Sequence, residues 1–209
     1  MSKKLIRYII LIAVIGLLGY NSVYFKKLDA KEIITTANAS PVEVAQQFWA
    51  KQLPAYMDSA IEINVFLQML KANPQQVVEK YSHTQGIGNI TFFLVKGEGI
   101  IEAVNEDEVM VTVRTIAGEI KLQLVTGVYF GNAVRDVTGK ISMGDFANTM
   151  DFNTVSTELN KQLRTAVIIP FKTTAKKGNA IAFTGCIEMN KEKIDTTAIA
   201  LLPLKIINQ

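Results

Sequence analysis

The chain has 209 residues, 49% apolar and 20% charged, a composition that excludes wholesale disorder and fits one globular domain. Lys3, Lys4 and Arg7 supply the whole formal net charge of +3, so the rest of the chain is neutral and offers no broad field for nucleic acid. The single cysteine, Cys186, excludes an intrachain disulfide framework.

The first predicted element is a membrane anchor. No charged residue occurs from Tyr8 to Phe25, and the basic residues lie just before this stretch. At about 1.5 Å per residue it would span roughly 27 Å, close to the ~30 Å of a bilayer core. We therefore predict an uncleaved, single-pass signal anchor over residues 1–27 in the cell membrane, with the rest of the chain extracytoplasmic. A cleaved signal peptide is the main alternative, but no Ala-x-Ala-like site follows Leu18.

Residues 28–40 are predicted to be a tether, and residues 41–209 a single extracytoplasmic domain that begins with helices. Ser40 followed by Pro41 is typical of a helix start, because serine caps free amides and proline suits the first turn. The predicted helices are 41–57, kinked or divided at Pro54, then 60–70 and 74–81.

Beyond Gly86 the apolar period changes from about 3.6 to 2, which indicates strands. A tight turn is predicted at Ala117 and Gly118, and the glycine pairs Gly86-x-Gly88 and Gly97-x-Gly99 are interpreted as turn or bulge residues. Because helices come first and strands follow, we predict an α+β fold, mainly β, with an antiparallel, barrel-like sheet. The predicted strands are 90–96, 99–104, 109–115, 119–125, 137–143, 166–172, 180–189 and 197–207, with a helix at 152–163.

No catalytic residue, metal site or cofactor is predicted. His83 is the only histidine and follows a helix in a polar stretch, which favours a structural role. Cys186 lies in a predicted strand without an evident base beside it. A hydrolase would need a nucleophile and a base that the sequence does not reveal.

The densest polar cluster contains Arg135, Asp136, Asp145 and Asn148. One interpretation is a buried ion pair and turn network, in which Arg135 pairs with an aspartate and Asp145 or Asn148 caps the following helix. The alternative is a ligand-binding pocket that uses these four residues for a small polar ligand.

A family resemblance begins at the same cluster. Gly131 to Asp136, Ile141 to Asn148, and Leu159-Asn160 resemble the signature of a bacterial domain-of-unknown-function family of predicted periplasmic lipoproteins. Earlier segments that also resemble it are Phe48-Trp49, Leu53-Pro54 and Val95 to Gly99. The resemblance implies an OB-like β-barrel with added helices. It also implies an export or anchor segment and genes that often lie beside ribose-type ABC sugar transporter genes.

This chain has Tyr20 where a lipoprotein signal would need cysteine, so we expect a membrane anchor rather than a lipid. The resulting functional expectation is a non-enzymatic accessory to an ABC-type carbohydrate transporter, in contact with its permease or solute-binding protein. The alternative is a sugar- or nucleoside-binding domain that uses the barrel face or the Arg135, Asp145 and Asn148 region, with no role in nucleic-acid binding.

Overall fold

The computed structural model describes residues 39–115, 118–196 and 198–209, which lie within one compact unit, Ile34–Gln209. The predicted anchor at 1–27 and all but the last two residues of the predicted tether lie outside the described residues. Among the helices of the described ranges, none has the length and apolar character needed to cross a membrane.

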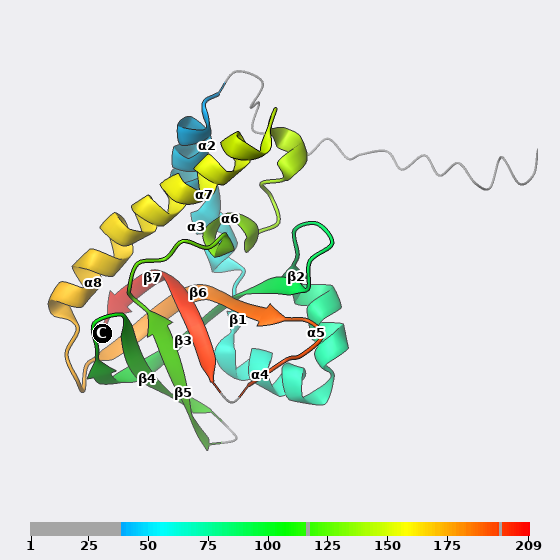
Figure 1. The fold of residues 1–209 in the computed structure, drawn as a ribbon. Coiled ribbons are helices and arrows are strands. Elements are labelled where there is room, and N and C mark those ends of the chain that lie inside the picture. Colours follow the sequence, from blue (N-terminus) through cyan, green and yellow to red (C-terminus); the bar gives the residue numbers. More distant parts are fainter. Residues whose placement is uncertain (1–38, 116–117, 197) are drawn as a thin grey trace, which may run out of the picture. The chain divides into compact units, whose positions relative to one another are not determined.

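A closed, mainly antiparallel barrel confirms the predicted α+β class and OB-like architecture (Figure 1). The strands follow the order β3-β4-β5-β7-β6, and β3 pairs again with β6 to close the ring. Only the β5–β7 contact in this ring is parallel. The turn predicted at Ala117 and Gly118 falls partly outside the described residues. The barrel strands are β3 (Ile90–Val104), β4 (Glu108–Thr115), β5 (Gly118–Val125), β6 (Ala180–Asn190) and β7 (Ile199–Asn208).

Strand β3 is one continuous strand of 15 residues, whereas the sequence predicts two strands separated near Gly97 and Gly99. It pairs with β6 along its first part and with β4 along its last part, so it has to coil around the barrel. Its glycines permit close approach on the inner side. A Cβ at Gly97 would lie 2.6 Å from Ile63 Cγ2, and a Cβ at Gly99 would lie 2.8 Å from the Thr112 carbonyl oxygen. The glycines therefore mark a bend within one strand.

The barrel interior forms the first hydrophobic core. Val109, Val111 and Val113 alternate into it, as the period of two requires. Helices α4 (Ile63–Ala72) and α5 (Pro74–Tyr81) add apolar side chains to this core, and the Phe66 and Phe93 ring centroids lie 5.0 Å apart. Short strands β1 (Ile61–Glu62) and β2 (Ser82–His83) join these helices to β3, so the predicted helix at 60–70 begins only at Ile63.

A second core lies on the outer face of β6 and β7, beneath a layer of helices (Figure 1). Phe48, Leu159, Cys186 and Leu202 are buried there, so helices and strands far apart in sequence share one apolar layer. Its burial stabilises the fold by about 1.5–3 kcal/mol for each large side chain. The helical segments on this side are α2 (Pro41–Gln47), η1 (Phe48–Gln52), α3 (Leu53–Asp58), α6 (Ala133–Asp136), η2 (Met143–Asp145), α7 (Thr149–Leu163) and η3 (Arg164–Ile168), and α8 (Ile169–Thr174) follows η3 and adds Phe171 to the first core.

Both long helical segments change to a π-helical turn directly before a proline. In η1 the Leu53 amide donates to the Phe48 carbonyl, and the equivalent bond in η3 runs from Ile169 to Arg164. Proline lacks an N–H and crowds the carbonyl four residues earlier, so a wider turn accommodates it. Pro54 therefore widens one turn of the predicted helix and does not end it.

Residues 137–143 and 166–172 form no strand, and both predictions are wrong. The first segment turns at Gly139, where φ is +63°. The second continues α7 through η3 into α8 and buries Ile168 and Phe171, three residues apart on one helical face. Helical burial therefore overrides the local preference of its β-branched residues for strands.

Candidate functional site

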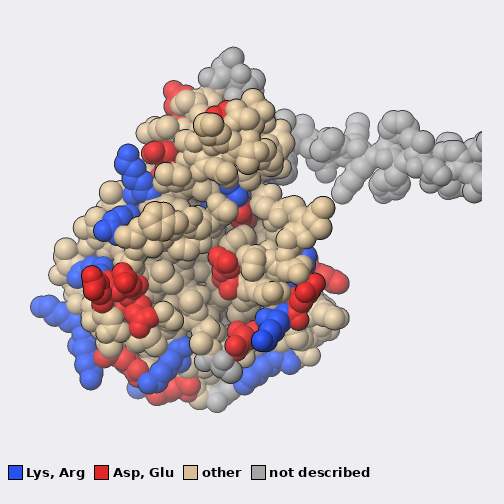
Figure 2. Space-filling model, viewed as in Figure 1, with Lys and Arg blue, Asp and Glu red and all other residues tan. Residues whose placement is uncertain are grey.

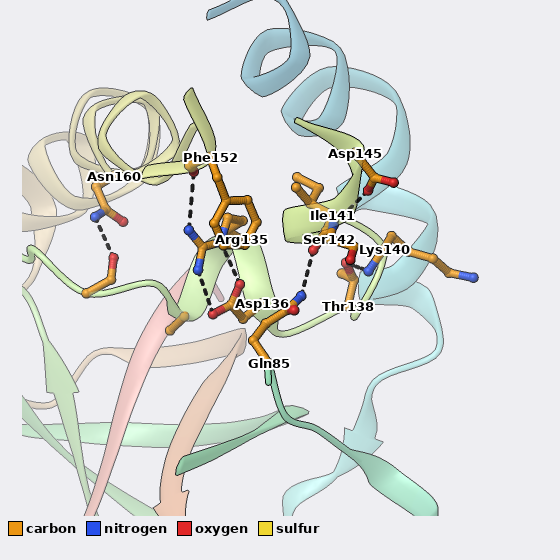
Figure 3. A network of polar contacts seen from close by, with 12 residues as sticks. Gln85, Arg135, Asp136, Thr138, Lys140, Ile141, Ser142, Asp145, Phe152 and Asn160 are labelled. Carbon is orange, nitrogen blue, oxygen red and sulfur yellow. Dashed lines mark hydrogen bonds and ion pairs between the residues drawn. The ribbon is translucent and has the colours of Figure 1, made fainter. Parts of the chain in front are cut away.

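Arg135 and Asp136, two of the predicted ligand-binding residues, are neighbours in α6 and form a buried ion pair (Figure 3). Arg135 Nε donates to Asp136 Oδ1 at 2.6 Å, and Arg135 Nη2 donates to Asp136 Oδ2 at 3.0 Å. Each residue is only 3% exposed. Burial raises the pKa of Asp136, while the hydrogen bond and positive charge of Arg135 oppose that rise.

The remaining guanidinium nitrogen of Arg135 connects α6 to α7. Arg135 Nη1 donates to the Phe152 carbonyl at 3.2 Å, and the guanidinium carbon lies 3.5 Å from the centroid of the Phe152 ring. Such stacking adds a cation–π attraction to the hydrogen bond. Every guanidinium nitrogen has a partner, and because Arg135 is only 3% exposed, a ligand could reach it only if the surrounding side chains moved.

Asp145 and Asn148, the other two predicted residues, stand at helix starts. The Ser142 amide donates to Asp145 Oδ2 at 2.8 Å in the capping box of η2. The Asp151 amide donates to Asn148 Oδ1 at 2.9 Å, which caps α7. These contacts are those of an ion-pair and turn network. Ligand binding by the four residues stays a prediction.

His83 and Cys186 lie in different settings. His83 is in β2, where burial and the nearby charge of Lys140 lower its pKa, so it is neutral at physiological pH. Cys186 is 2% exposed in the second core, and burial raises the pKa of its thiol well above the usual value. A protonated, enclosed thiol is a poor nucleophile. Within the described ranges, no three His, Cys, Asp or Glu side chains gather as metal ligands would.

A groove of about 740 Å³ on the outer barrel face is the second candidate site. The pairing of β3, β6 and β7 places the residues of its floor side by side. Glu98 pairs with Ala182, which also pairs with Ile207, and the adjacent row joins Ile100 to Ala180. Ile100 and Ile207 are 41% and 50% exposed, and the alanines between them keep the floor low. The floor is therefore an exposed apolar strip.

Charged side chains of both signs surround the apolar floor. Figure 2 shows Lys and Arg side chains interleaved with Asp and Glu along the lower margin of one face of the molecule, where Figure 1 places the β4–β5 hairpin. Lys121 Nζ lies 3.2 Å from Glu102 Oε2, and the Thr112 hydroxyl and Lys121 lower the pKa of Glu102. The charged residues that line the groove include Lys96, Glu98, Glu102, Arg114 and Lys205.

Two amide side chains add neutral hydrogen-bonding groups. Gln209 Nε2 donates to Glu98 Oε1 at 2.9 Å at one end of the groove. Asn64, in the first turn of α4, has a buried Oδ1 without a hydrogen-bond partner among the described residues. A buried acceptor without a partner costs about 1–3 kcal/mol, so a ligand that donates to it would recover part of that cost. The arrangement is suited to binding a polar ligand.

The sequence predicts the barrel face as one alternative for ligand binding but none of the residues of this groove, although one signal for them is present. Lys96, Glu98 and Glu102 occupy alternate positions of β3, which indicates a polar outer face. The partners across the groove come from β6 and β7, about 80 to 110 residues later, and their register depends on closure of the barrel. Only the folded structure brings these side chains together.

Comparisons with known proteins agree with this architecture. The family model described as "Predicted periplasmic lipoprotein (DUF2291)" matches residues 13–207. The crystal structure of an OB-fold protein from Thermotoga maritima is 26% identical to the chain, with a TM-score of 0.71. The similarity covers 82% of this chain and 99% of that chain. Among curated proteins, none matches.

Proposed function

The chain belongs to the family of predicted periplasmic lipoproteins, and we propose that it is a membrane-anchored extracytoplasmic domain that binds a small, sugar-like ligand in the groove. In this proposal the uncharged stretch from Tyr8 to Phe25 crosses the membrane once and leaves residues 41–209 outside the cytoplasm. The single cysteine is Cys186, buried in β6, so it is not available to carry a lipid.

The observation that carries the proposal is an apolar strip bordered by hydrogen-bonding groups. A sugar ring presents C–H groups on its faces and hydroxyl groups around its edge, so it could pack on Ile100 and Ile207 and bond to the charged rim. Asn64 Oδ1 would accept a hydrogen bond from a hydroxyl group. The volume of about 740 Å³ falls within the usual range for small-ligand sites. A nucleoside shares the ribose part of this chemistry.

The proposal is one of binding without catalysis. Glu102 pairs with Lys121, and Glu98 accepts from Gln209, so each of these two carboxylates already has a partner. The pKa of Glu102 is lowered, which suits a hydrogen-bond acceptor and disfavours a general acid at neutral pH.

The test is thermal unfolding of the full chain in detergent with a panel of sugars and nucleosides. At a ligand concentration 100 times Kd, binding stabilises the folded state by about 2.7 kcal/mol, which raises Tm by several degrees. Ala182→Phe should fill the groove and abolish the shift. Ala200→Phe, at an exposed alanine of β7 outside the groove, is the matched control and should retain it. A panel without any shift, or a shift that survives in Ala182→Phe, would contradict the proposal.

The region of Arg135, Asp136, Asp145 and Asn148 is the alternative ligand site. It is less favourable because Arg135 is only 3% exposed and each of its guanidinium nitrogens already has a partner within the protein. The sugar panel distinguishes the two sites. A ligand-induced shift that disappears in Asn148→Ala, but persists in Ala182→Phe, would assign binding to this region.

A second function is supported by a different surface. We propose that the domain also acts as an accessory to an ABC-type carbohydrate transporter and contacts its permease or solute-binding protein. An accessory protein needs a docking surface, and the exposed Phe130 with the neighbouring Val128 offers one. Pull-down of the tagged full chain from native membranes should recover transporter subunits. Repeated pull-downs that recover no transporter subunit would contradict this role.

A further inference from the structure

The loop from Gly127 to Gly131 presents two apolar side chains to solvent. Val128 is 59% exposed and Phe130 is 88% exposed. Tyr129 between them points the other way and packs against the second core. An exposed aromatic ring on a surface loop loses the stabilisation that burial would give. Exposed apolar groups that lie together are typical of interaction sites.

Contacts at both ends and in the middle fix the shape of this loop. The Thr126 and Gly127 amides both donate to the Asp107 carbonyl at 2.8 Å. The Asn160 side-chain amide donates to the Gly131 carbonyl at 2.8 Å (Figure 3), and the Ala133 amide donates to the Tyr129 hydroxyl at 3.3 Å. A fixed loop loses little conformational entropy when a partner binds. Phe130 is therefore exposed in a preorganised setting.

A cavity of about 230 Å³ lies between this loop and the end of α7. Its apolar lining includes Leu163, Ile168 and Leu202, and it has room for an apolar side chain. Asn160 Oδ1 also belongs to this region and is buried without a hydrogen-bond partner among the described residues. The cavity thus combines an apolar floor with an acceptor that lacks a donor.

The charged residues at the edge of the cavity indicate which charge a partner should carry there. Lys161 Nζ lies 3.9 Å from Glu158 Oε2, so the positive charge of Lys161 is partly balanced. Arg164 is exposed and forms no ion pair within the ranges that the structure describes. A carboxylate on the partner would complement Arg164, because arginine binds carboxylates through paired N–H groups.

We infer that the 127–131 loop and its cavity form a docking site for a protein partner, which inserts one apolar side chain beside a carboxylate. The partner's backbone N–H or hydroxyl would donate to Asn160 Oδ1, and Phe130 would pack on the partner. A protein segment fits better than lipid chains, because acyl chains would leave Asn160 Oδ1 without a donor. The inference rests on the accessory role proposed above and names the surface that serves it.

The experiment uses the full chain in intact cells with a photo-crosslinking benzophenone residue at position 130. Val65 of α4, which is 48% exposed, is the matched control position. We expect a discrete adduct with one protein from position 130 and none from position 65. The crosslinked segment should contain an apolar residue next to Asp or Glu. Arg164→Glu should reduce the adduct about fivefold or more, and Arg164→Lys should restore part of it.

Several outcomes would overturn the inference. These are a lipid adduct, an adduct with a second copy of this chain, equal yields at positions 130 and 65, or a yield that Arg164→Glu leaves unchanged. Unaltered thermal unfolding of each variant shows that the fold is intact. If pull-down recovers transporter subunits without crosslinking at position 130, the inference fails and the accessory role stands. If position 130 crosslinks to a protein unrelated to transport, the docking site stands and the accessory role is contradicted.

Discussion

Arg135 and Asp136 show how two residues can hold separate elements together. Their side chains are 3% and 4% exposed, and Arg135 also bonds to the Phe152 carbonyl in α7. Removing one partner of a buried pair leaves the other charge without compensation, which costs about 3–5 kcal/mol. Each member of the pair therefore contributes to stability because it neutralises the buried charge of the other.

We predict that Arg135→Ala lowers the free energy of unfolding by about 3–5 kcal/mol, as measured by urea denaturation. Arg114→Ala is the control, because Arg114 forms an exposed ion pair with Glu119, and its loss should cost at most about 1 kcal/mol. Similar losses in the two variants would show that the buried pair has no special structural role.

The pKa of Asp136 predicts a pH dependence for the same variant. Burial raises this pKa above its unfolded value, so the folded state binds the proton more tightly. Stability then falls as pH rises through the folded pKa, and increases again as pH is lowered. Arg135→Ala removes the interactions that oppose the shift. Its destabilisation at neutral pH should therefore shrink in acid, measured by urea denaturation over a pH series. A loss that is the same at every pH would contradict this assignment.

At the scale of elements, the coil of β3 determines both the barrel and the groove. One strand pairs with β6 and then with β4, which brings the outward side chains of these strands to one face. Gly97 and Gly99 permit this coil because neighbouring atoms already occupy the space that a Cβ would need at these two positions. The polar groove is thus a consequence of the same bend that closes the barrel.

We predict that Gly99→Ala destabilises the protein by about 1–3 kcal/mol, because its Cβ would lie 2.8 Å from the Thr112 carbonyl oxygen in the adjacent strand. Gly144→Ala is the control, since the nearest atom would be 4.0 Å from the new Cβ, and its effect should stay within about 0.5 kcal/mol. Urea denaturation measures both. A neutral Gly99→Ala variant would show that β3 can shift without cost.

At the scale of the whole molecule, the enclosed thiol of Cys186 makes the location of the domain testable. Cys186 is 2% exposed and its thiol is protonated, so the native chain should not react with a thiol reagent. Val65→Cys adds an exposed thiol on α4, outside the proposed docking site, at a position where the native side chain is 48% exposed.

We predict that a reagent unable to cross the cytoplasmic membrane labels Val65→Cys in intact cells and leaves the wild-type chain unlabelled. Gel analysis of the labelled protein measures the result, and urea-unfolded wild-type protein is the positive control for Cys186. Labelling of Val65→Cys only after the membrane is disrupted would show that the domain is cytoplasmic.

Local patterns were sufficient where neighbouring residues decide the structure. Ser40 and Pro41 start α2, Asn73 and Pro74 start α5, and the alternation in β4 matches its burial. Local preference failed at residues 166–172, where α7 continues in spite of several β-branched residues. Burial against β7 decided that segment, and a short window of sequence contains no information about β7.

The sequence by itself determined the α+β class, most of the helix starts and strands, and the composition of the polar cluster around Arg135. The tertiary structure decided that Arg135 pairs with Asp136, and that β3, β6 and β7 present one groove. The reason is that capping and periodicity act over a few residues, whereas the β3–β6 register depends on contacts between residues 80 to 100 positions apart.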